Sequence, residues 1–464
     1  MYNKCMKKRT FKGGIHPKEM KELSNKCPIT EAFPSSKTVT IPVTMGGAPN
    51  TPLVKVGDVV AKGQKIADGT AFMSCPVHSS VSGTVKAIKK CLVTANTEVP
   101  CIVIESDDSG ETAYMEPLDP FTCDTKTALQ RIKDAGIVGM GGASFPAHVK
   151  LNPPADKEIL YVLVNAAECE PYLTCDERTL QETPERVIDG LAIILNMTGA
   201  TGIIALEDNK AYIKPLLEAE IEKKNYGDDI RVQIVKTKYP QGAEKFIVSA
   251  CVSVEIPSAK LPADAGCIIS NVGTVCAISD AFRLGKPLIE RSLTISGEAV
   301  DKPCNLRVPV GTLISDLEGT YFNVTDKAAK CISGGPMMGF AMVSTAFPVA
   351  KGTSGVTFLP AEKTYLTDED PCISCGKCIK ACPMHLTPVL MVREIKAGHY
   401  DKARKLGLMD CIECGCCSFI CPANVRLVQR FRLGKGVIRA QMAEAKAKEA
   451  AKKAAEEAKK GEAK

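Results

Sequence analysis

The chain has 464 residues, of which 45% are hydrophobic and 24% charged, and its 59 Lys and Arg against 53 Asp and Glu leave a net charge of +6. This composition is that of a globular protein of roughly three or four domains, and so small a positive excess argues against a nucleic-acid-binding protein. No stretch approaches the ~20 uninterrupted apolar residues of a membrane-spanning helix. The basic start lacks the apolar segment of a signal peptide, so we expect a cytosolic protein that reaches a membrane only through a partner.

The N-terminal region reads as β-structure. Residues 53–69 and 76–88 are short alternating runs separated by Gly-containing turns. Their order resembles the barrel-sandwich hybrid of biotinyl and lipoyl carrier domains, in which a hairpin lysine takes the prosthetic group. The corresponding segment here, DGTAFMSCPV at 68–77, contains no lysine, so the resemblance implies the fold and argues against a swinging arm.

From about Cys123 onward, strands alternate with helices. The patterns predict strands at 158–165, 201–208, 230–237 and 266–273, and helical stretches at 177–199 and 209–225. This alternation indicates βαβ units and a mostly parallel sheet. Residues 288–360 return to β-structure, and residues 440–464 form an Ala/Lys/Glu-rich tail that would be helical but has no apolar stripe for docking.

The chain has 22 cysteines, which in a large protein without a signal peptide indicates thiolates kept reduced for metal. Eight of them form the pattern C-x2-C-x2-C-x3-C-P twice, and most of the others have apolar neighbours typical of small buried side chains. In this pattern the fourth cysteine of each run binds the cluster of the other run. Structural zinc sites use paired knuckles, commonly with histidine, so the runs predict two [4Fe–4S] clusters. Cluster one is expected at Cys372, Cys375, Cys378 and Cys421, and cluster two at Cys411, Cys414, Cys417 and Cys382, with Cys416 as a bystander.

A glycine-rich loop, GMGGASFPAHVK at 139–150, precedes the first predicted strand of the α/β region. Three polar segments follow predicted strands: NAAECEP at 165–171, KYPQGAEK at 238–245 and ISNVGT at 269–274. The carboxyl ends of parallel strands meet at one edge of a sheet, where open α/β sheets bind ligands. Each segment alone would be an ordinary turn, but together they predict one crevice.

These four segments resemble, in order, the flavin- and nicotinamide-binding segments of the NADH-oxidising subunit of respiratory complex I. Residues 288–360 resemble the β-grasp module that follows the flavin domain there. With FKGGIHP at 11–17, the carrier-like region in front and the two cysteine runs behind, the whole order is similar to the RnfC family. Its members are subunits of the Rnf complex, a membrane ferredoxin:NAD oxidoreductase coupled to ion transport. The resemblance covers residues from about 10 to 435.

The resemblance implies a residue-level site. Gly139, Gly141 and Gly142 would line FMN, with Lys150 near its phosphate; Asn165, Glu168, Tyr239, Gly242, Asn271 and Thr274 would surround the flavin; Phe145, Glu170 and Glu244 would face the nicotinamide nucleotide. No separate catalytic acid or base is implied. The sequence departs from the complex I pattern at Met140, Ser144, Ala167, Ala243 and Gly273, and these departures fall mainly on the acidic edge that would face NADH.

The fold class is therefore multidomain α/β. We expect a carrier-like barrel-sandwich domain at 1–122, an FMN- and NADH-binding α/β domain with a mostly parallel sheet at 123–287, and a β-grasp domain at 288–362. A helical ferredoxin-like domain with two [4Fe–4S] clusters would follow at 363–436, and the tail would occupy 437–464.

The implied function is hydride exchange between NAD(H) and FMN, with single electrons passing through the clusters. Its implied setting is a peripheral subunit on the cytoplasmic face of the cell membrane, bound to the other subunits, exchanging electrons with ferredoxin only indirectly and binding no nucleic acid. Three alternatives remain: a soluble flavin and iron–sulfur cobalamin reductase, in which the carrier-like domain follows the clusters; a non-enzymatic electron-transfer module with an empty flavin crevice; and a carrier protein.

Overall fold

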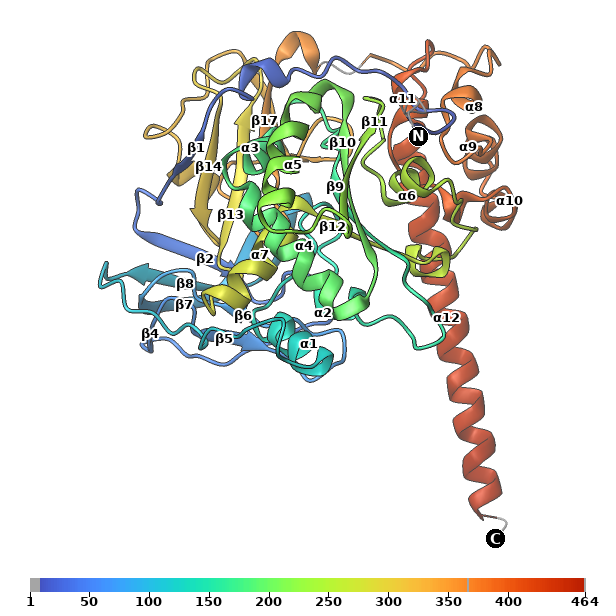
Figure 1. Cartoon of the computed structure of the whole chain (residues 1–464). Helices are drawn as coiled ribbons and strands as arrows, with labels where there is room; N and C mark the ends of the chain where they lie inside the picture. The colour runs from blue at the N-terminus through green and yellow to red at the C-terminus, as the bar shows by residue number, and fades with distance from the viewer. Residues whose placement is uncertain (1–8, 365–366, 463–464) are drawn as a thin grey trace. The chain divides into compact units, whose positions relative to one another are not determined.

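The computed structural model describes residues 9–364 and 367–462. The chain divides into two compact units, one made of residues 1–10 and 17–365 and the other of residues 11–16 and 366–464. The second unit therefore takes a short piece of chain from near the N-terminus. We refer to them as the first and the second unit (Figure 1).

Two small sheets form the N-terminal part of the first unit, with strand orders β2-β8-β7-β4 and β3-β5-β6. Their strands are β2 (Thr38–Pro42), β3 (Thr51–Pro52), β4 (Val59–Val60), β5 (Lys65–Asp68), β6 (Val77–His78), β7 (Gly83–Val93) and β8 (Thr97–Ser106). Ile41 of β2 and Ile66 of β5 belong to one buried core. The two sheets therefore share a single small core, as expected for a sandwich of short strands.

A four-stranded parallel sheet follows, with the order β11-β10-β9-β12. Its elements are α1 (Thr125–Asp134), α2 (Ala147–Lys150), β9 (Tyr161–Ala166), α3 (Cys175–Glu182), α4 (Pro184–Thr198), β10 (Thr201–Glu207), α5 (Lys214–Lys223), β11 (Ile230–Val235), α6 (Glu244–Val252), β12 (Cys267–Asn271) and α7 (Val272–Arg283). All four predicted strands and their parallel arrangement are confirmed. The chain moves outward from β9 to β11 and then returns to the other side of β9, so the order reverses between β9 and β12.

Each face of this sheet has its own core. Val162 and Val164 of β9 pack with α4, α5 and α7, whereas Leu163 packs on the opposite face with α6. Strand side chains alternate between the two faces, and both faces are covered because parallel sheets are joined by helical crossovers. The helices thus leave the carboxyl ends of the strands as the open edge.

Prolines divide the two predicted helical stretches. The stretch 177–199 is two helices, α3 and α4, separated at Thr183, which has φ −139° and ψ 52°. Pro184 disfavours helical geometry in the residue before it and begins the second helix. In the same way, the stretch 209–225 is a 3₁₀ helix at Asp208–Ile213 followed by α5, with Pro215 in the first turn of α5.

A six-stranded mixed sheet completes the first unit, in the order β1-β14-β13-β17-β15-β16. Its strands are β1 (Ile29–Glu31), β13 (Glu290–Ser296), β14 (Cys304–Pro309), β15 (Ala328–Ser333), β16 (Phe340–Met342) and β17 (Gly355–Pro360). β1 pairs in parallel with β14, although the sequence assigned its residues to the N-terminal domain. β1 has only three residues and none of them is buried, so no alternating pattern marks it.

The described residues 367–462 of the second unit form helices joined by loops, and none of them is in a strand. The unit contains α8 (Lys377–Ala381), α9 (Pro388–Lys396), α10 (Tyr400–Lys405), α11 (Cys416–Phe419) and α12 (Leu427–Glu462). Met391 of α9 and Phe431 of α12 are fully buried in its core, which extends to Ile438. The predicted tail is thus the continuation of α12 (Figure 1), and its first turns still belong to the packed core.

Within the described residues, no helix is both long enough and apolar enough to cross a bilayer.

One helix contact in the parallel-sheet region gives a stability prediction. A Cβ placed on Gly190 of α4 would lie 1.9 Å from the carbonyl oxygen of Val275 in α7. Gly190→Ala must push these helices apart, and overpacking of this kind costs about 1–3 kcal/mol. We expect a lower unfolding midpoint in urea than for Gly227→Ala, whose added Cβ would meet nothing within 4 Å. Equal midpoints for the two variants would contradict the close packing of α4 on α7.

Candidate functional site

The glycine-rich loop is a tight backbone turn that leads into α2. The amide of Gly139 donates to the carbonyl of Phe145 at 2.8 Å, and Val138 forms an antiparallel bridge with Pro146. Ser144 has φ 51°, in the left-handed region, where the family pattern has glycine. The turn leaves open space around the position that a Cβ of Gly142 would occupy, and 39% of the Phe145 side chain is exposed.

This loop is fastened to the start of α7. The amide of Met140 donates to Oγ1 of Thr274 at 3.0 Å, and the Asn271 side chain caps α7 by accepting from the amide of Gly273 at 2.8 Å. A Cβ on Gly141 would lie 3.2 Å from Cβ of Asn271. The loop therefore meets the carboxyl end of β12 at close range.

The guanidinium of Arg291, from β13, also holds the loop. It donates through Nη2 to the carbonyl of Met140 at 3.2 Å and through Nε to the carbonyl of Thr353 at 2.7 Å, and only 3% of the residue is exposed. Sequence analysis missed this residue, because nothing in the local pattern around Arg291 points to a partner about 150 positions earlier.

The other predicted segments join the same edge of the sheet. Asn165, at the end of β9, donates through Nδ2 to the carbonyl of Gly242 at 2.7 Å, and it pairs in register with Asn271 of β12. Lys150 donates through Nζ to Oε1 of Glu244 at 2.6 Å and to the carbonyl of Ile269 at 3.1 Å. All four segments are thus brought together where the strand order reverses, which is the position at which open α/β sheets bind ligands.

The carboxylates of two predicted acidic residues accept hydrogen bonds from backbone amides. The carboxylate of Glu168 accepts from the amides of Asp176 and Glu177, at 2.9 and 3.4 Å, and so caps the start of α3. Glu170 accepts from the amides of Met337 and Met338 at 2.6 and 3.2 Å. Both carboxylates are therefore engaged by backbone groups that the sequence did not place beside them.

Two lysines donate hydrogen bonds to the backbone of the segment 165–171. Lys21, which is 6% exposed, donates to the carbonyl of Glu170 at 3.2 Å, and Lys210 donates to the carbonyl of Glu168 at 3.4 Å. Burial alone would lower the pKa of Lys210, but the carboxylates of Glu207 and Glu168 raise it above its ordinary value. Lys210 therefore stays charged, and both supporting lysines come from parts of the chain that carry no motif.

Asp176 is a further carboxylate beside this segment that sequence analysis missed. It accepts from Nδ2 of Asn271 at 2.6 Å. Burial and the negative charge of Glu168 raise its pKa, while the positive charge of Arg291 opposes that rise. Asp176 thereby ties α3 to the capping residue of α7.

Tyr239 lies in the same part of the first unit but is only 2% exposed. Nearby, Gly242 is required by a close approach, because a Cβ there would lie 2.4 Å from the carbonyl oxygen of Ala167. The segment 238–245 therefore passes tightly against the segment 165–171.

The crevice fits a flavin mononucleotide in its donor chemistry. The residue that precedes α6, Ala243, has no side chain that could cap the helix, and helix starts with free amides attract phosphate. Lys150 places its ammonium group beside this helix start, where it pairs with the carboxylate of Glu244, the first residue of α6. Because residues 139, 141 and 142 are glycines, no side chains at these positions of the adjoining loop block access to its backbone.

The hairpin tip of the N-terminal β region lies against the glycine loop. Nε2 of His148 in α2 is 3.3 Å from the carbonyl oxygen of Phe72. A Cβ on Gly46 would overlap the carbonyl oxygen of Ser144, and one on Gly47 would overlap that of Met73. In a carrier domain this tip would present a lysine on a mobile arm, whereas here its backbone contacts α2 and Gly47 and its exposed tip residue is Phe72, which is 66% exposed.

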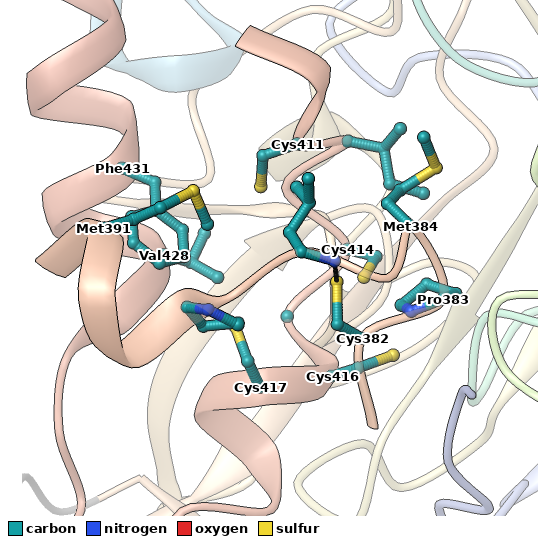
Figure 2. A pocket seen from close by; sticks show the side chains of 14 residues that line it. Cys382, Pro383, Met384, Met391, Cys411, Cys414, Cys416, Cys417, Val428 and Phe431 are labelled. Atoms are coloured by element: carbon teal, nitrogen blue, oxygen red, sulfur yellow. Dashed lines mark hydrogen bonds between the residues drawn. The ribbon is translucent and has the colours of Figure 1, made fainter. Parts of the chain in front are cut away.

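The second unit contains a cavity lined by four cysteines that the sequence assigned to cluster two. Cys382, Cys411, Cys414 and Cys417 surround it (Figure 2), and Met391, Val428 and Phe431 supply apolar walls. Cys382 comes from the first cysteine run and the other three from the second. The structure therefore brings together the crossed ligand set that the spacing predicts.

Backbone amides point at two of these sulfurs. The amide of Leu386 lies 3.3 Å from Sγ of Cys382, and that of Glu413 lies 3.4 Å from Sγ of Cys411. Lys435 of α12 donates to the carbonyl of Cys411 and to Oε1 of Glu413, and so ties the long helix to the second run. All eight predicted ligands are free thiols without disulfides, as thiolate ligands of a cluster must be.

The remaining four cysteines are arranged more openly. Cys372 and Cys375 are exposed, Cys378 and Cys421 are half-buried, and burial raises the pKa of Cys378, to which the charge of Cys421 adds. Cys416, expected to be a bystander, is buried and also lines the cavity of cluster two. It interacts with Cys414 through its side chain, so it is a neighbour of the ligands and stays outside the predicted ligand set.

Family models match three of the four expected domains. Residues 9–109 match the RnfC barrel sandwich hybrid domain, residues 132–280 match the Nuo51 FMN-binding domain, and residues 364–422 match a 4Fe-4S dicluster domain. The expected barrel-sandwich fold, flavin region and paired clusters are each supported by a separate model.

Whole-chain relatives decide the family. The chain is 41% identical to the C subunit of the proton-translocating ferredoxin:NAD(+) oxidoreductase complex of Clostridium ljungdahlii, over 95% of this chain and 96% of that one. It is 40% identical to the C subunit of the Na(+)-translocating ferredoxin:NAD(+) oxidoreductase complex of Acetobacterium woodii, over 94% and 98%. The chain belongs to the RnfC family.

More distant comparisons agree with this family. The C subunit of the ion-translocating oxidoreductase complex of Rhodobacter capsulatus is 38% identical over 92% of this chain and 83% of its own length. Among solved structures, the H2-reduced NAD+-reducing [NiFe]-hydrogenase matches with a TM-score of 0.50 and 19% identity, over 68% of this chain and 63% of that one. At that identity the match shows a shared fold only.

The environment of Glu170 predicts a pH-dependent stability. Burial raises the pKa of its carboxyl from 4.5 to about 7. The folded state therefore binds this proton more tightly, so the free energy of unfolding falls as the pH rises from about 4.5 through about 7, by up to about 3 kcal/mol. Glu170→Gln keeps an acceptor for the amide of Met337 and should unfold in urea with a smaller loss of stability between pH 5 and pH 8. Identical pH dependence in both proteins would show that this carboxyl does not titrate as described.

The crossed cysteines predict which cluster each variant loses. Cys382→Ala should remove cluster two, about four of roughly eight irons, and leave the electron paramagnetic resonance signal of cluster one. Cys421→Ala should do the reverse, and Cys416→Ala, in the same cavity, should keep both clusters. Iron analysis and spectra of the reduced proteins measure this; loss of the same cluster in the first two variants would refute the crossed assignment.

Proposed function

We propose that this chain is the NAD(H)-reactive subunit of a membrane ferredoxin:NAD oxidoreductase coupled to ion transport. It would exchange a hydride between NAD(H) and FMN and pass single electrons through two [4Fe–4S] clusters. The observation that supports this most directly is the joint presence of two sites in one chain. The glycine loop and three strand-end segments meet at the switch point of the first unit, and a crossed four-cysteine cavity lies in the second.

FMN would occupy the crevice between the glycine loop and the strand ends. A bound flavin accepts a hydride as two electrons and returns them singly, which suits clusters that take one electron at a time. Gly139, Gly141 and Gly142 allow the ring system to approach the backbone. Asn165, Tyr239, Gly242, Asn271 and Thr274 surround it and fix its orientation, and Lys150 with the start of α6 holds its phosphate.

NAD(H) would enter along Phe145 and Glu244, whose side chains are 39% exposed and 44% exposed, respectively. Phe145 offers an aromatic face on which a nucleotide ring can stack. Glu168 and Glu170 act indirectly in this proposal: their carboxylates hold α3 and the segment 334–339 in place and so keep the segment 165–171 in its binding geometry.

We assign these roles to four domains followed by a tail, at 1–122, 123–287, 288–362, 363–436 and 437–464, with β1 contributed to the third domain by the first. The other subunits of the complex would hold the chain at the cytoplasmic face of the membrane as a peripheral subunit. They would handle the transported ion and connect the clusters to ferredoxin. The lysine-free hairpin tip at 68–77 disfavours the carrier alternative.

Lys150→Ala tests the flavin site. Loss of the positive charge beside α6 should weaken phosphate binding, so the purified variant should retain less FMN than the wild type, by tenfold or more in affinity, and its rate of NADH-dependent dye reduction should fall in proportion. The iron content should stay at about eight. Lys223→Ala, on an exposed position of α5, is the matched control and should retain flavin fully. Equal loss of FMN and iron in Lys150→Ala would contradict the separation of the two sites.

A further inference from the structure

The segment Phe11–His16 is a part of the chain to which the proposed function assigns no role. The chain leaves the first unit after Thr10, contributes these six residues to the second unit, and returns to the first unit at Pro17. We call this segment the N-terminal strap. Its sequence, FKGGIH, has two apolar side chains flanking a pair of glycines, which is unlike an ordinary polar linker.

The strap lies against the backbone that carries Cys382. The amide of Gly14 donates to the carbonyl of Ala381 at 2.9 Å, and Ala381 is the last residue of α8. Carbonyls at the end of a helix lack partners within it, so the strap supplies a donor that α8 cannot. This fixes the residue immediately before the cluster ligand.

The contact is too close for any residue but glycine. A Cβ on Gly13 would lie 2.7 Å from the carbonyl oxygen of Cys382 and 3.0 Å from Cα of Pro383. Gly13 and Gly14 also have φ of 78° and 76°, a region that side chains disfavour. Two independent constraints therefore require small residues where the strap crosses the ligand.

The strap also carries two buried apolar side chains. Phe11 is 8% exposed and Ile15 is 6% exposed, and both lie within the second unit. Cys382, whose backbone this segment adjoins, is itself buried at 8% exposure, whereas Cys372 and Cys375 of the same run, which are predicted ligands of cluster one, are exposed. The two cluster sites therefore differ in their access to water.

We propose that the N-terminal strap is a positioning element for cluster two, which holds Cys382 in its buried position and thereby sets the reduction potential of that cluster separately from that of cluster one. Reduction adds one negative charge to a cluster, and burial disfavours the more highly charged form. Solvent exposure and hydrogen bonds to sulfur are the protein's means of tuning such potentials. Loosening the strap should therefore raise the potential of cluster two.

The test is a potentiometric titration of the anaerobic full-length protein, followed by electron paramagnetic resonance. The signal of cluster two is identified by its loss in Cys411→Ala. In Gly13→Ala, the ratio of reduced to oxidised cluster two, measured at the wild-type midpoint, should rise at least tenfold, which corresponds to about 59 mV for one electron. The midpoint of cluster one should not move.

Gly398→Ala is the matched control. Gly398 also lies in the second unit with φ 75°, but a Cβ there would meet nothing within 4 Å. This control carries the same backbone strain without the collision at Cys382, so its two midpoints should equal those of the wild type. A double variant, Phe11→Ala with Ile15→Ala, removes the two buried apolar side chains that anchor the strap and keeps the glycines, and it should shift the potential of cluster two in the same direction.

If Gly13→Ala loses cluster two alone, about four irons of eight, that result would show that the strap holds Cys382 in place. The double variant then serves to measure the reduction potential of cluster two. An unchanged or lowered midpoint for cluster two in the double variant, or an equal shift of both clusters, would overturn the proposal. This inference rests on the clusters and not on NADH chemistry. A wild-type protein without clusters would refute the proposed function, whereas intact clusters without a selective shift would refute only the strap.

Discussion

The hydrogen bonds that the buried guanidinium of Arg291 makes to the glycine loop are the interaction on which the crevice depends. Arg291 donates to the carbonyls of Met140 and Thr353, and Oγ1 of Thr274 accepts from the amide of Met140. The loop is thus held between β13 of the mixed sheet and α7 of the parallel sheet. Because a buried charge without partners is strongly unfavourable, these acceptors must stay in place whenever the unit is folded.

Because the glycine loop is held in place, the reversal of strand order in the parallel sheet becomes a bounded binding crevice. The strand order reverses between β9 and β12, and the loop closes the open edge at that point. Most of the residues that would contact FMN come from strand ends or helix starts, which are rigid. The two acidic side chains of this region bind backbone amides: Glu168 caps α3, and Glu170 accepts from the segment 334–339. Rigid surroundings of this kind position a cofactor whose own chemistry carries the reaction.

The two units divide the electron chemistry between them. In the first unit the proposed flavin handles electron pairs, and in the second the clusters handle single electrons. The second unit is built around its ligands, since Met391, Val428 and Phe431 line the cavity of cluster two while also forming part of its small hydrophobic core. Removal of a cluster is therefore expected to loosen this unit as well as to interrupt electron transfer.

Much of the fold and of the site could be predicted from sequence, because the signals were local. The four parallel strands show buried runs between helical patterns, and the double cysteine pattern gives the crossed ligand set through spacing alone. Features that depend on distant partners could not be predicted. Lys21 and Arg291 have no motif, and each acts on backbone about 150 residues away. The short strand β1 has no buried face, and the directions of Glu168 and Glu170 are decided by neighbouring amides that no pattern reveals.

The most direct test of the central claim is an anaerobic titration of the purified wild-type protein with NADH, followed by absorbance and electron paramagnetic resonance, beside the same protein depleted of FMN. The account predicts that NADH bleaches the flavin and that electrons then appear on the clusters, whereas the clusters of the FMN-depleted protein stay oxidised until FMN is restored. Reduction of the clusters by NADH at the same rate without FMN, or no spectral change in the fully loaded protein, would contradict it.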